Sequence, residues 1–220
     1  MADLLTPTTS TGLQLLLTAE RLFARHGIDG VSLRQIAGEA GSSNNSAVRY
    51  HFGSKHDLLH AILAYRLRDL VQRRKLRLER ADPEDLRARI EAHLLPLLEL
   101  AEAPDCNYVS FVEQLQRSGD EAVFAGQQEV LRSRAEFAAA MRAFLRALPE
   151  PARAVRIAQA QDLCVHLAAE RERAVDRGDA RLPFALYVST AVDAVTGLLA
   201  APASPETAGL ISRGTPSPGR

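Results

Sequence analysis

The amino-acid sequence predicts an all-α protein. Ala, Leu, Arg and Glu, which favour helices, are abundant among the 220 residues. Apolar residues recur every three or four positions between about residues 11 and 200, and no stretch alternates with the period of two that a half-buried strand requires. Glycine, proline and small polar residues interrupt this pattern and divide it into about nine helices.

The first three predicted helices are short. The first, about Thr11–Arg25, stops before Gly27, a residue typical of helix ends. The second begins at Ser32, because Ser32-Leu33-Arg34-Gln35 fits a capping box, and it ends at Gly41. The third, about Asn45–His51, follows a turn of serine and asparagine.

Longer helices are expected in the rest of the chain. Ser54 and Asp57 begin a fourth helix that reaches about Arg80. Asp82-Pro83 opens the fifth, since proline is preorganised for a first helical position, and Pro96 is expected to kink or divide it. The remaining helices are expected at about Asn107–Ser118, Ala122–Leu148, Pro151–Arg177 and Pro183–Ala200.

These elements predict four regions. Residues 1–10 carry no periodicity and are expected to be flexible. Residues 11–57 form a three-helix domain, and residues 58–200 form a larger helical domain. Residues 201–220 contain four prolines together with Ser, Thr and Gly, which predicts a disordered tail.

Charge is distributed unevenly although the formal net charge is zero. Residues 1–80 hold 12 Lys or Arg against 7 Asp or Glu, whereas residues 81–220 hold 15 against 20. A basic N-terminal third beside an acidic remainder suggests a module that binds a polyanion, joined to a body with another task.

Several classes of protein are not expected. The sequence has no glycine-rich phosphate loop, nucleophile elbow or metalloprotease motif, so we expect neither an enzyme nor a cofactor. Cys164 and His166 are two residues apart and lie on different faces of a helix, so no metal site is expected. With only Cys106 and Cys164, no apolar run of about 18 residues and no signal peptide, we expect a cytoplasmic protein without a membrane partner.

Residues 32–52 have the layout of a helix-turn-helix, in which the second helix enters the major groove of DNA. If Val48 and Phe52 pack inward with Ala47, the opposite face presents Asn45, Ser46, Arg49 and Tyr50. Asparagine can pair with adenine and arginine with guanine, and Ser or Tyr can bind phosphate. Ser54-Lys55 then begins a helix that suits a phosphate, and no Asp or Glu occurs between Glu39 and Asp57.

The segment Leu22–Leu63 resembles the DNA-binding domain of the TetR family of bacterial transcriptional regulators. The matching features are Leu22-Phe23, His26-Gly27, Ser32-Leu33-Arg34-Gln35-Ile36-Ala37, Ala40-Gly41, Tyr50-His51-Phe52, Gly53-Ser54-Lys55 and Leu58-Leu59. Two features differ: the turn Gly41–Ser46 is one residue longer than the commonest version, and Arg49 stands where tyrosine is frequent.

The resemblance implies a ligand-responsive regulator that binds a palindromic operator in double-stranded DNA. The residues that would contact DNA are Ser32, Arg34, Gln35, Asn44, Asn45, Ser46, Arg49, Tyr50, His51 and Lys55. Ser32 could instead serve only as a helix cap, and His51 only as a partner of helix C-terminal carbonyls. Repression is the usual outcome in the family, and activation is the alternative. A second alternative is a helical scaffold whose DNA-reading head does not function.

The resemblance also implies a homodimer built from the last two long helices. The last helix carries an apolar band for this interface, formed by Phe184, Tyr187, Val188, Ala191, Val192, Val195, Leu198 and Leu199. A helix fully buried inside one monomer would show the same band.

A small-molecule effector is expected to bind in the larger domain. Candidate pocket residues are Phe111, Gln114, Phe124, Phe137, Met141, Phe144 and His166, with His93 as a further polar group. Ordinary core packing is the alternative explanation for each of them.

Overall fold

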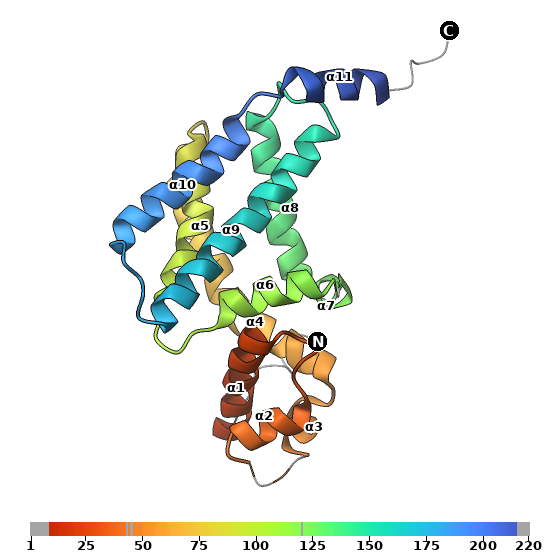
Figure 1. The fold of residues 1–220 in the computed structure, drawn as a ribbon, viewed down its shortest axis with the longest axis vertical. Helices are drawn as coiled ribbons and strands as arrows, with labels where there is room; N and C mark the ends of the chain where they lie inside the picture. The colour runs from red at the N-terminus through yellow and green to blue at the C-terminus, as the bar shows by residue number, and fades with distance from the viewer. Residues whose placement is uncertain (1–8, 43, 45, 120, 215–220) are drawn as a thin grey trace.

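The computed structural model describes residues 9–42, 44, 46–119 and 121–214, and every regular element among them is an α-helix (Figure 1). The helices are α1 (Ser10–His26), α2 (Leu33–Glu39), α3 (Ala47–Phe52), α4 (Lys55–Leu78), α5 (Leu86–Ala101), α6 (Tyr108–Ser118), α7 (Glu121–Ala125), α8 (Gln128–Phe144), α9 (Ala152–Asp176), α10 (Phe184–Ala200) and α11 (Pro205–Gly214). The all-α prediction is confirmed, with eleven helices in the described residues where about nine were expected.

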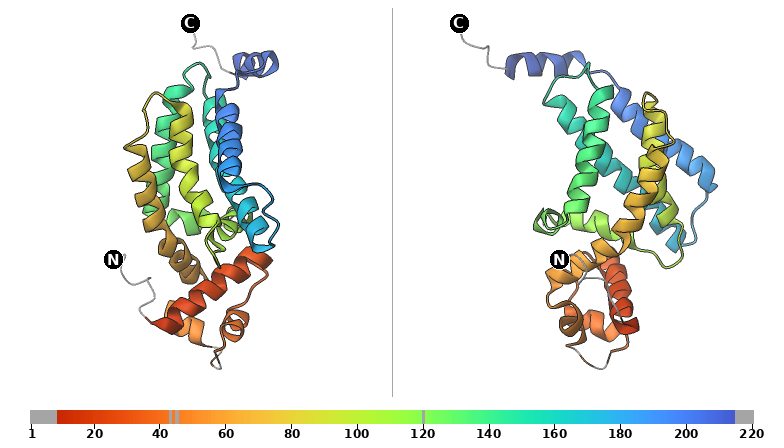
Figure 2. Two further views of the ribbon diagram at one scale, coloured as in Figure 1. Left: turned by 90° about the vertical axis from the view of Figure 1, so that its left-hand side faces the viewer. Right: turned by 180° about the vertical axis from the view of Figure 1, so that it is seen from behind.

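The helices form a small head and a larger body (Figures 1 and 2). The head consists of α1, α2, α3 and the first turns of α4, and α4 then continues into the body. Helices α5, α8, α9 and α10 make up most of the body, while α6 and α7 lie at the end of the body that faces the head. The predicted boundary between residues 57 and 58 therefore falls inside α4, which the head and the body share.

Local hydrogen bonds fix the ends of α2 as the sequence indicated. The Ser32 Oγ accepts a hydrogen bond from the Gln35 amide at 3.2 Å and caps the N-terminus of α2. At the C-terminus, the Gly41 amide donates to the Gly38 carbonyl and the Ser42 amide to the Ala37 carbonyl, the two bonds of a Schellman motif. Gly41 takes a φ of +73° there, a backbone conformation that side chains disfavour.

A capping box starts α4, as predicted. The Asp57 amide donates to the Ser54 Oγ at 3.1 Å, and the Ser54 amide donates to the Asp57 carboxylate at 3.1 Å. These bonds satisfy two amide groups that the first turn of a helix leaves without partners. The long helix therefore begins at a defined residue, directly after α3.

Two helices of the body are divided differently from the prediction. Pro96 does not divide α5, which continues across it, because packing against α4, α9 and α10 holds the helix together across the missing amide donor. The helix expected at Ala122–Leu148 is divided at Gly126, where a Cβ atom would lie 2.5 Å from the His60 ring. The break between α7 and α8 is thus set by contact with α4, which the local sequence does not reveal.

The disordered tail predicted for residues 201–220 is wrong for residues 205–214, which form α11. Ser204 accepts a hydrogen bond from the Thr207 amide at 3.2 Å, and Pro205 is the first helical residue. Serine followed by proline is a start signal for a helix, which the overall composition of the segment obscured.

Carboxylates from the head and the body meet at the N-terminus of α6. Glu20 of α1 accepts a hydrogen bond from the Asn107 amide at 3.0 Å. Glu172 of α9 accepts hydrogen bonds from the Val109 and Ser110 amides at 3.0 and 2.8 Å. Both glutamates are buried, and the amide groups that they bind carry the positive end of the α6 dipole. Helix α6 is thereby tied to α1 and α9 together.

Burial changes the acidity of these two glutamates. Burial raises the pKa of Glu172 to about 7, although the Ser110 and Val109 amides favour the charged form. Burial also raises the pKa of Glu20, against the effects of the Asn107 amide and of Arg66, whose Nε lies 3.7 Å from the carboxylate. The folded chain therefore binds a proton on each of these groups more tightly than an unfolded chain does.

The two cysteines, Cys106 and Cys164, are buried free thiols. Burial raises the pKa of each thiol to about 12, which keeps it protonated and unreactive. Among the described residues, no group of three or more His, Cys, Asp or Glu side chains could hold a metal ion. No single described helix is long and apolar enough to cross a membrane; α10 and α11 pass this test only as a pair, bent by 46°.

The capping box of α4 can be tested with Ser54→Ala. We expect the free energy of unfolding to fall by about 1 kcal/mol, because an amide of the first turn loses its partner. Urea denaturation measures this, and Ser212→Ala, on an exposed face of α11, serves as the control with a change within about 0.5 kcal/mol. Equal stability of wild type and Ser54→Ala would contradict the role of the cap.

The raised pKa of Glu172 can be tested with Glu172→Gln. Between the ordinary pKa of 4.5 and the folded value of about 7, the folded chain holds the proton more tightly, so this group makes stability fall as pH rises. The Tm of Glu172→Gln, relative to wild type, should therefore be higher at about pH 8 than at about pH 5.

The matched control for this experiment is Glu170→Gln, which alters an exposed carboxylate on the same helix. Thermal unfolding followed by circular dichroism at both pH values should show no such change for the control. A Tm difference between Glu172→Gln and wild type that is the same at both pH values would rule out the shifted titration.

Candidate nucleic-acid interface

Helix α3 has one buried and one exposed face, as predicted. Val48 is fully buried, and Ala47 and Phe52 are buried beside it in the core of the head. Arg49 is exposed, and the Tyr50 side chain is 85% exposed. The structure thus places a guanidinium and a phenol side by side on a helix at the free end of the head.

The turn before α3 is ordered by Asn44. The Asn44 Oδ1 accepts a hydrogen bond from the Ser46 amide at 2.8 Å, and its carbonyl accepts one from the Ala47 amide at 3.0 Å. Asn44 therefore holds the turn in place through these two hydrogen bonds. Both Asn44 and Ser46 remain exposed to solvent. Asn45, a predicted base contact, lies outside the described residues.

The remaining predicted contacts lie at the start of α2, in α3 itself and at the start of α4. Ser32, Arg34 and Gln35 are exposed at the N-terminus of α2, where the Ser32 hydroxyl already serves as the cap. His51 is half-buried, with its ring edge-on to Tyr50 at a centroid distance of 5.2 Å. The Lys55 Nζ lies 5.6 Å from the centroid of the Phe23 ring, so the aliphatic part of Lys55 covers the head core.

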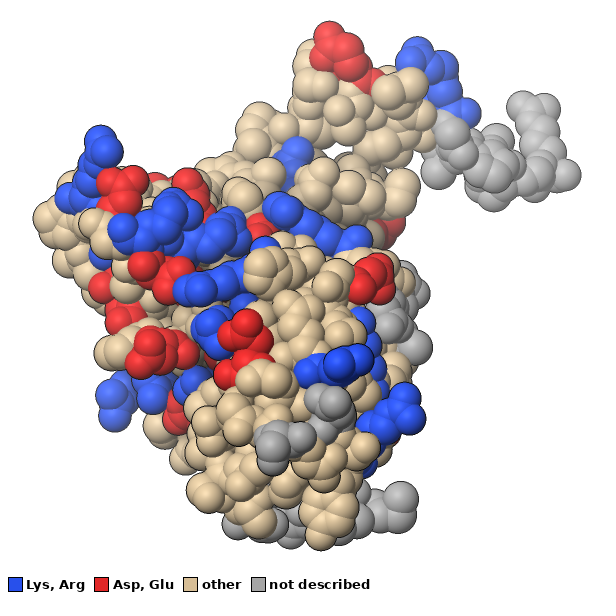
Figure 3. Space-filling model, turned by 60° about the horizontal axis from the view of Figure 1, so that its bottom comes forward, with Lys and Arg blue, Asp and Glu red and all other residues tan. Residues whose placement is uncertain are grey.

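The carboxylates that flank this surface are engaged with neighbours. Glu39 lies 3.6 Å from the Arg21 guanidinium, and Asp57 belongs to the capping box. No Asp or Glu occurs in the sequence between these two residues. Seen from the end where the head lies, the molecule presents few acidic atoms over the tip of the head (Figure 3). The face can therefore approach a polyanion without repulsion from free carboxylates.

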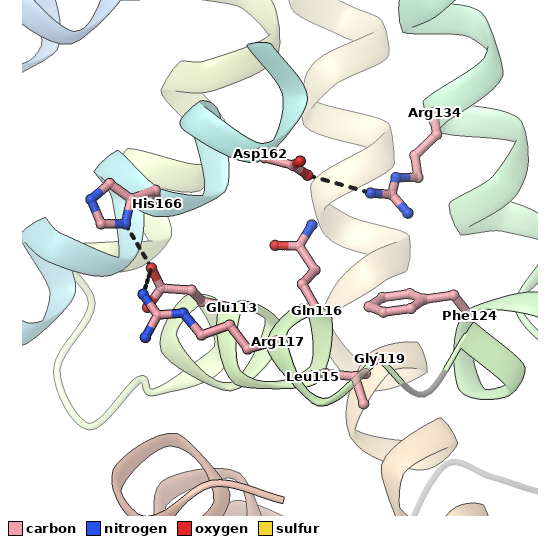
Figure 4. A pocket seen from close by; sticks show the side chains of 9 residues that line it. All are labelled: Glu113, Leu115, Gln116, Arg117, Gly119, Phe124, Arg134, Asp162 and His166. Atoms are coloured by element: carbon pink, nitrogen blue, oxygen red, sulfur yellow. Dashed lines mark hydrogen bonds and ion pairs between the residues drawn. The ribbon is translucent and has the colours of Figure 1, made fainter. Parts of the chain in front are cut away.

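Three neighbouring cavities open into the body. The outer cavity, about 450 Å³, lies between α6, α8 and α9 (Figure 4). The inner cavity, about 90 Å³, shares Gln116, Phe124 and Arg134 with it. The lateral cavity, about 630 Å³, lies between α4, α5 and α8 and shares Arg74, His93 and Ser133 with the inner cavity. A cavity system of this size can hold a small organic molecule.

The structure brings some of the predicted pocket residues to these cavities. Phe124 and His166 line the outer cavity, and Phe137 and Met141 line the lateral one. Phe111 lines none of the three and is instead buried against Phe23, at a centroid distance of 6.2 Å.

Two further predicted pocket residues also lie elsewhere, and several residues that line the cavities, Arg74 among them, were not predicted. Gln114 lies at a separate cavity between head and body, and Phe144 packs on the core without lining the three cavities. Arg74 was missed by sequence reasoning. Its position four residues after Leu70, on a buried stripe of α4 that includes Leu63 and Leu67, is the signal that could have identified it.

The predicted dimer residues require a correction. Val188, Ala191, Val192, Val195 and Leu199 are buried inside the monomer, where α10 packs on α5 and α9, so an isolated chain does not present them. Phe184, Tyr187 and Leu198 are half-buried against the same core. The apolar band of α10 marks its inward face, which is the alternative that the sequence left open.

Similarities to known proteins are found both in the head and in the fold of the chain. Residues 15–62 match the family model for bacterial regulatory proteins of the tetR family. None of the curated proteins matches the chain.

Solved structures share the fold of nearly the whole chain. FadR of Bacillus halodurans, a fatty acid degradation regulator, is 14% identical with a TM-score of 0.62 and covers 87% of this chain and 97% of its own. SCO4454, a TetR-family transcriptional regulator of Streptomyces coelicolor, is 20% identical with a TM-score of 0.53 and covers 87% and 95%. The superantigen PfiT is 16% identical with a TM-score of 0.52 and covers 86% and 96%.

The match to the regulatory family includes all of α2 and α3, most of α1 and the first turns of α4, the segments that build the head. The matched family consists of regulatory proteins, which agrees with the prediction of a regulator and not an enzyme. Residues 15–62 thus resemble the N-terminal domain of the tetR family of bacterial regulatory proteins, and the chain shares the fold of solved structures that include TetR-family regulators.

Proposed function

We propose that this protein is a transcriptional repressor that binds a palindromic operator as a homodimer and is released by a small-molecule effector. The observation that carries the proposal is the exposed face of α3, where Arg49 and Tyr50 stand in a segment free of acidic residues. Arginine can bind guanine with two hydrogen bonds, and tyrosine can bind a phosphate. Such a protein acts on DNA in the bacterial cytoplasm.

Positioning on the duplex comes from the surrounding residues. Arg34 and Gln35 at the start of α2 are exposed in the helix that precedes α3, and they can contact the phosphate backbone. Lys55 can add a second cation at the start of α4, where backbone amides also favour an anion. Contacts to phosphates fix the orientation of the head, while Arg49 distinguishes between bases.

Dimerisation would use the outward faces of α9 and α10. Leu182 and Leu186 are 46% and 49% exposed, and Val155 on the adjacent α9 is 54% exposed. Ala194 and Gly197 on the exposed face of α10 allow a second helix to approach closely. Two copies related by a two-fold axis would present two reading helices to the two halves of a palindrome.

A partner-binding protein with an inactive head is the second candidate. PfiT shares the fold and is described as a superantigen, so the fold does not by itself assign DNA binding. Selection of bound sequences from random DNA duplexes with the purified protein separates the two. We expect a palindromic consensus, and a protein that selects no sequence and shows no salt-dependent affinity would be the second candidate.

Arg49 and Lys55 should contribute differently to operator binding. Arg49→Ala is expected to weaken binding and to relax base preference at one position in each half-site, at a cost of about 1–3 kcal/mol per contact. Lys55→Ala is expected to weaken binding to all sequences alike and to make the salt slope shallower by about one unit. Equilibrium binding to a set of single-base operator variants at several salt concentrations measures both effects.

The control for this pair is Arg146→Ala, which removes an exposed arginine far along the chain, after α8. It should leave both the affinity and the salt slope near the wild-type values. Identical base preference for Arg49→Ala and Lys55→Ala would contradict their assigned roles.

The proposed dimer surface can be tested with Leu186→Glu. A carboxylate within an apolar interface is costly to desolvate, so the dissociation constant of the dimer should rise at least about tenfold. Size-exclusion chromatography with light scattering across a concentration series measures the change. Leu210→Glu, at a 63% exposed site on α11, should leave the dimer intact. A monomeric wild type, or an unchanged Leu186→Glu dimer, would refute this surface.

A further inference from the structure

Arg74 occupies an unusual place for an arginine, on the side of α4 that faces the body. Its Nε donates to the His93 carbonyl at 3.1 Å, and its Nη1 lies 3.5 Å from the Ser133 Oγ. It takes part in no ion pair with a carboxylate in the described part of the chain. The guanidinium therefore carries a charge that the surrounding protein does not balance.

The charge persists at neutral pH. Burial lowers the pKa of Arg74 only to about 10, so the side chain stays protonated. Burial, together with the neighbouring Arg74, lowers the pKa of His93 well below its ordinary value, so this imidazole is neutral and adds no second charge. Arg74 is half-buried, so an anion beside it could form a charge-assisted hydrogen bond with the guanidinium.

Arg74 borders two of the cavities. The inner cavity is lined mainly by leucine, valine and aromatic side chains, and the lateral cavity begins on the other side of Arg74 and His93. In the lateral cavity Phe137, Ala140 and Met141 form an apolar wall. Lys75, Arg89 and Arg132 also line this cavity, against Glu79 and Glu136, so cations are in excess there. The site offers both a positive charge and an apolar surface.

The outer cavity offers no such excess. Glu113 lies 2.7 Å from His166 and 3.3 Å from Arg117, and Asp162 lies 3.8 Å from Arg134 (Figure 4). Arg173 lies 2.6 Å from the same Glu113 carboxylate. Its cations and carboxylates are thus paired with one another across the cavity. An anionic group would have to displace one of these carboxylates there, whereas at Arg74 it would meet an unpaired guanidinium.

We propose that the lateral cavity binds a small organic carboxylate with an apolar body, whose acid group pairs with Arg74 and whose apolar body packs on Phe137 and Met141. A volume of about 630 Å³ is sufficient for a molecule of this class. That this carboxylate is the effector rests on the proposed function, whereas its binding at Arg74 does not. Arg74 lies on α4, which begins directly after α3. An acid bound at Arg74 therefore contacts the helix that links the cavity to the head.

Titration calorimetry with the full-length protein tests the proposal, using three carboxylates and their primary amides as probes. The pairs are octanoate and octanamide, decanoate and decanamide, and 4-phenylbutyrate and 4-phenylbutanamide. We expect at least one carboxylate to bind at least about tenfold more tightly than its amide, since a charge-assisted bond to arginine is lost in the amide.

Substitutions assign the preference to Arg74. Arg74→Gln should bind acid and amide equally, while Arg74→Lys should keep part of the preference. Arg68→Gln, which removes an exposed charge from the same helix, should behave as wild type. If Arg74→Gln does not unfold cooperatively, the Arg74→Lys variant and the acid-to-amide ratio of the wild type still test the claim.

Three results would overturn the proposal: no probe acid binds, each amide binds as tightly as its acid, or Arg74→Gln retains the wild-type preference. Binding is measured here without DNA, so its failure is separate from that of the proposed function. A chain that binds a carboxylate through Arg74 but no duplex would retain this site and lose the assignment as a repressor.

Discussion

Helix α4 contributes to two hydrophobic cores, and the rest of the structure depends on this sharing. Its first turns place Leu58, Leu59 and Ile62 in the core of the head, next to α1 and α3. Further along, Leu67 and Leu70 face the body, and Arg74 reaches the cavities. One continuous helix therefore joins the head that carries the exposed face of α3 to the cavities of the body.

Helix α6 provides the second connection, and its chemistry differs. Glu20 and Glu172 bind the amides at its N-terminus, so the junction between head and body consists of directional hydrogen bonds to buried carboxylates. Burying these groups costs free energy, which the raised pKa of Glu172 reflects. Because hydrogen bonds are directional, they fix the orientation of α1 and α9 relative to α6, whereas an apolar contact alone would let the helices slide past one another.

The pairing of charged side chains differs between regions of the chain. Carboxylates in the body are largely engaged with arginines or with amides, as Glu113 and Glu172 are, and these contacts serve the fold. The face of α3 and Arg74 are two of the exceptions in the described part of the chain. The face of α3 has cations without neighbouring free carboxylates, and Arg74 has a charge without a counter-ion. Both are sites where an external anion would complete the electrostatics, a phosphate in one case and an organic acid in the other.

The sequence by itself determined most of the helices, several of their caps and the exposed face of α3, because these depend on interactions within a few residues. Ser32, Gly41 and the pair Ser54 and Asp57 act locally, and the periodicity of α3 separates Val48 from Arg49. Only the tertiary structure decided which apolar stripes face inward: the band of α10 is core, Phe111 packs on the head, and Gly126 breaks a helix against His60. Periodicity reveals that a helix has an apolar face, but the partner of that face is set by contacts between residues far apart in the chain.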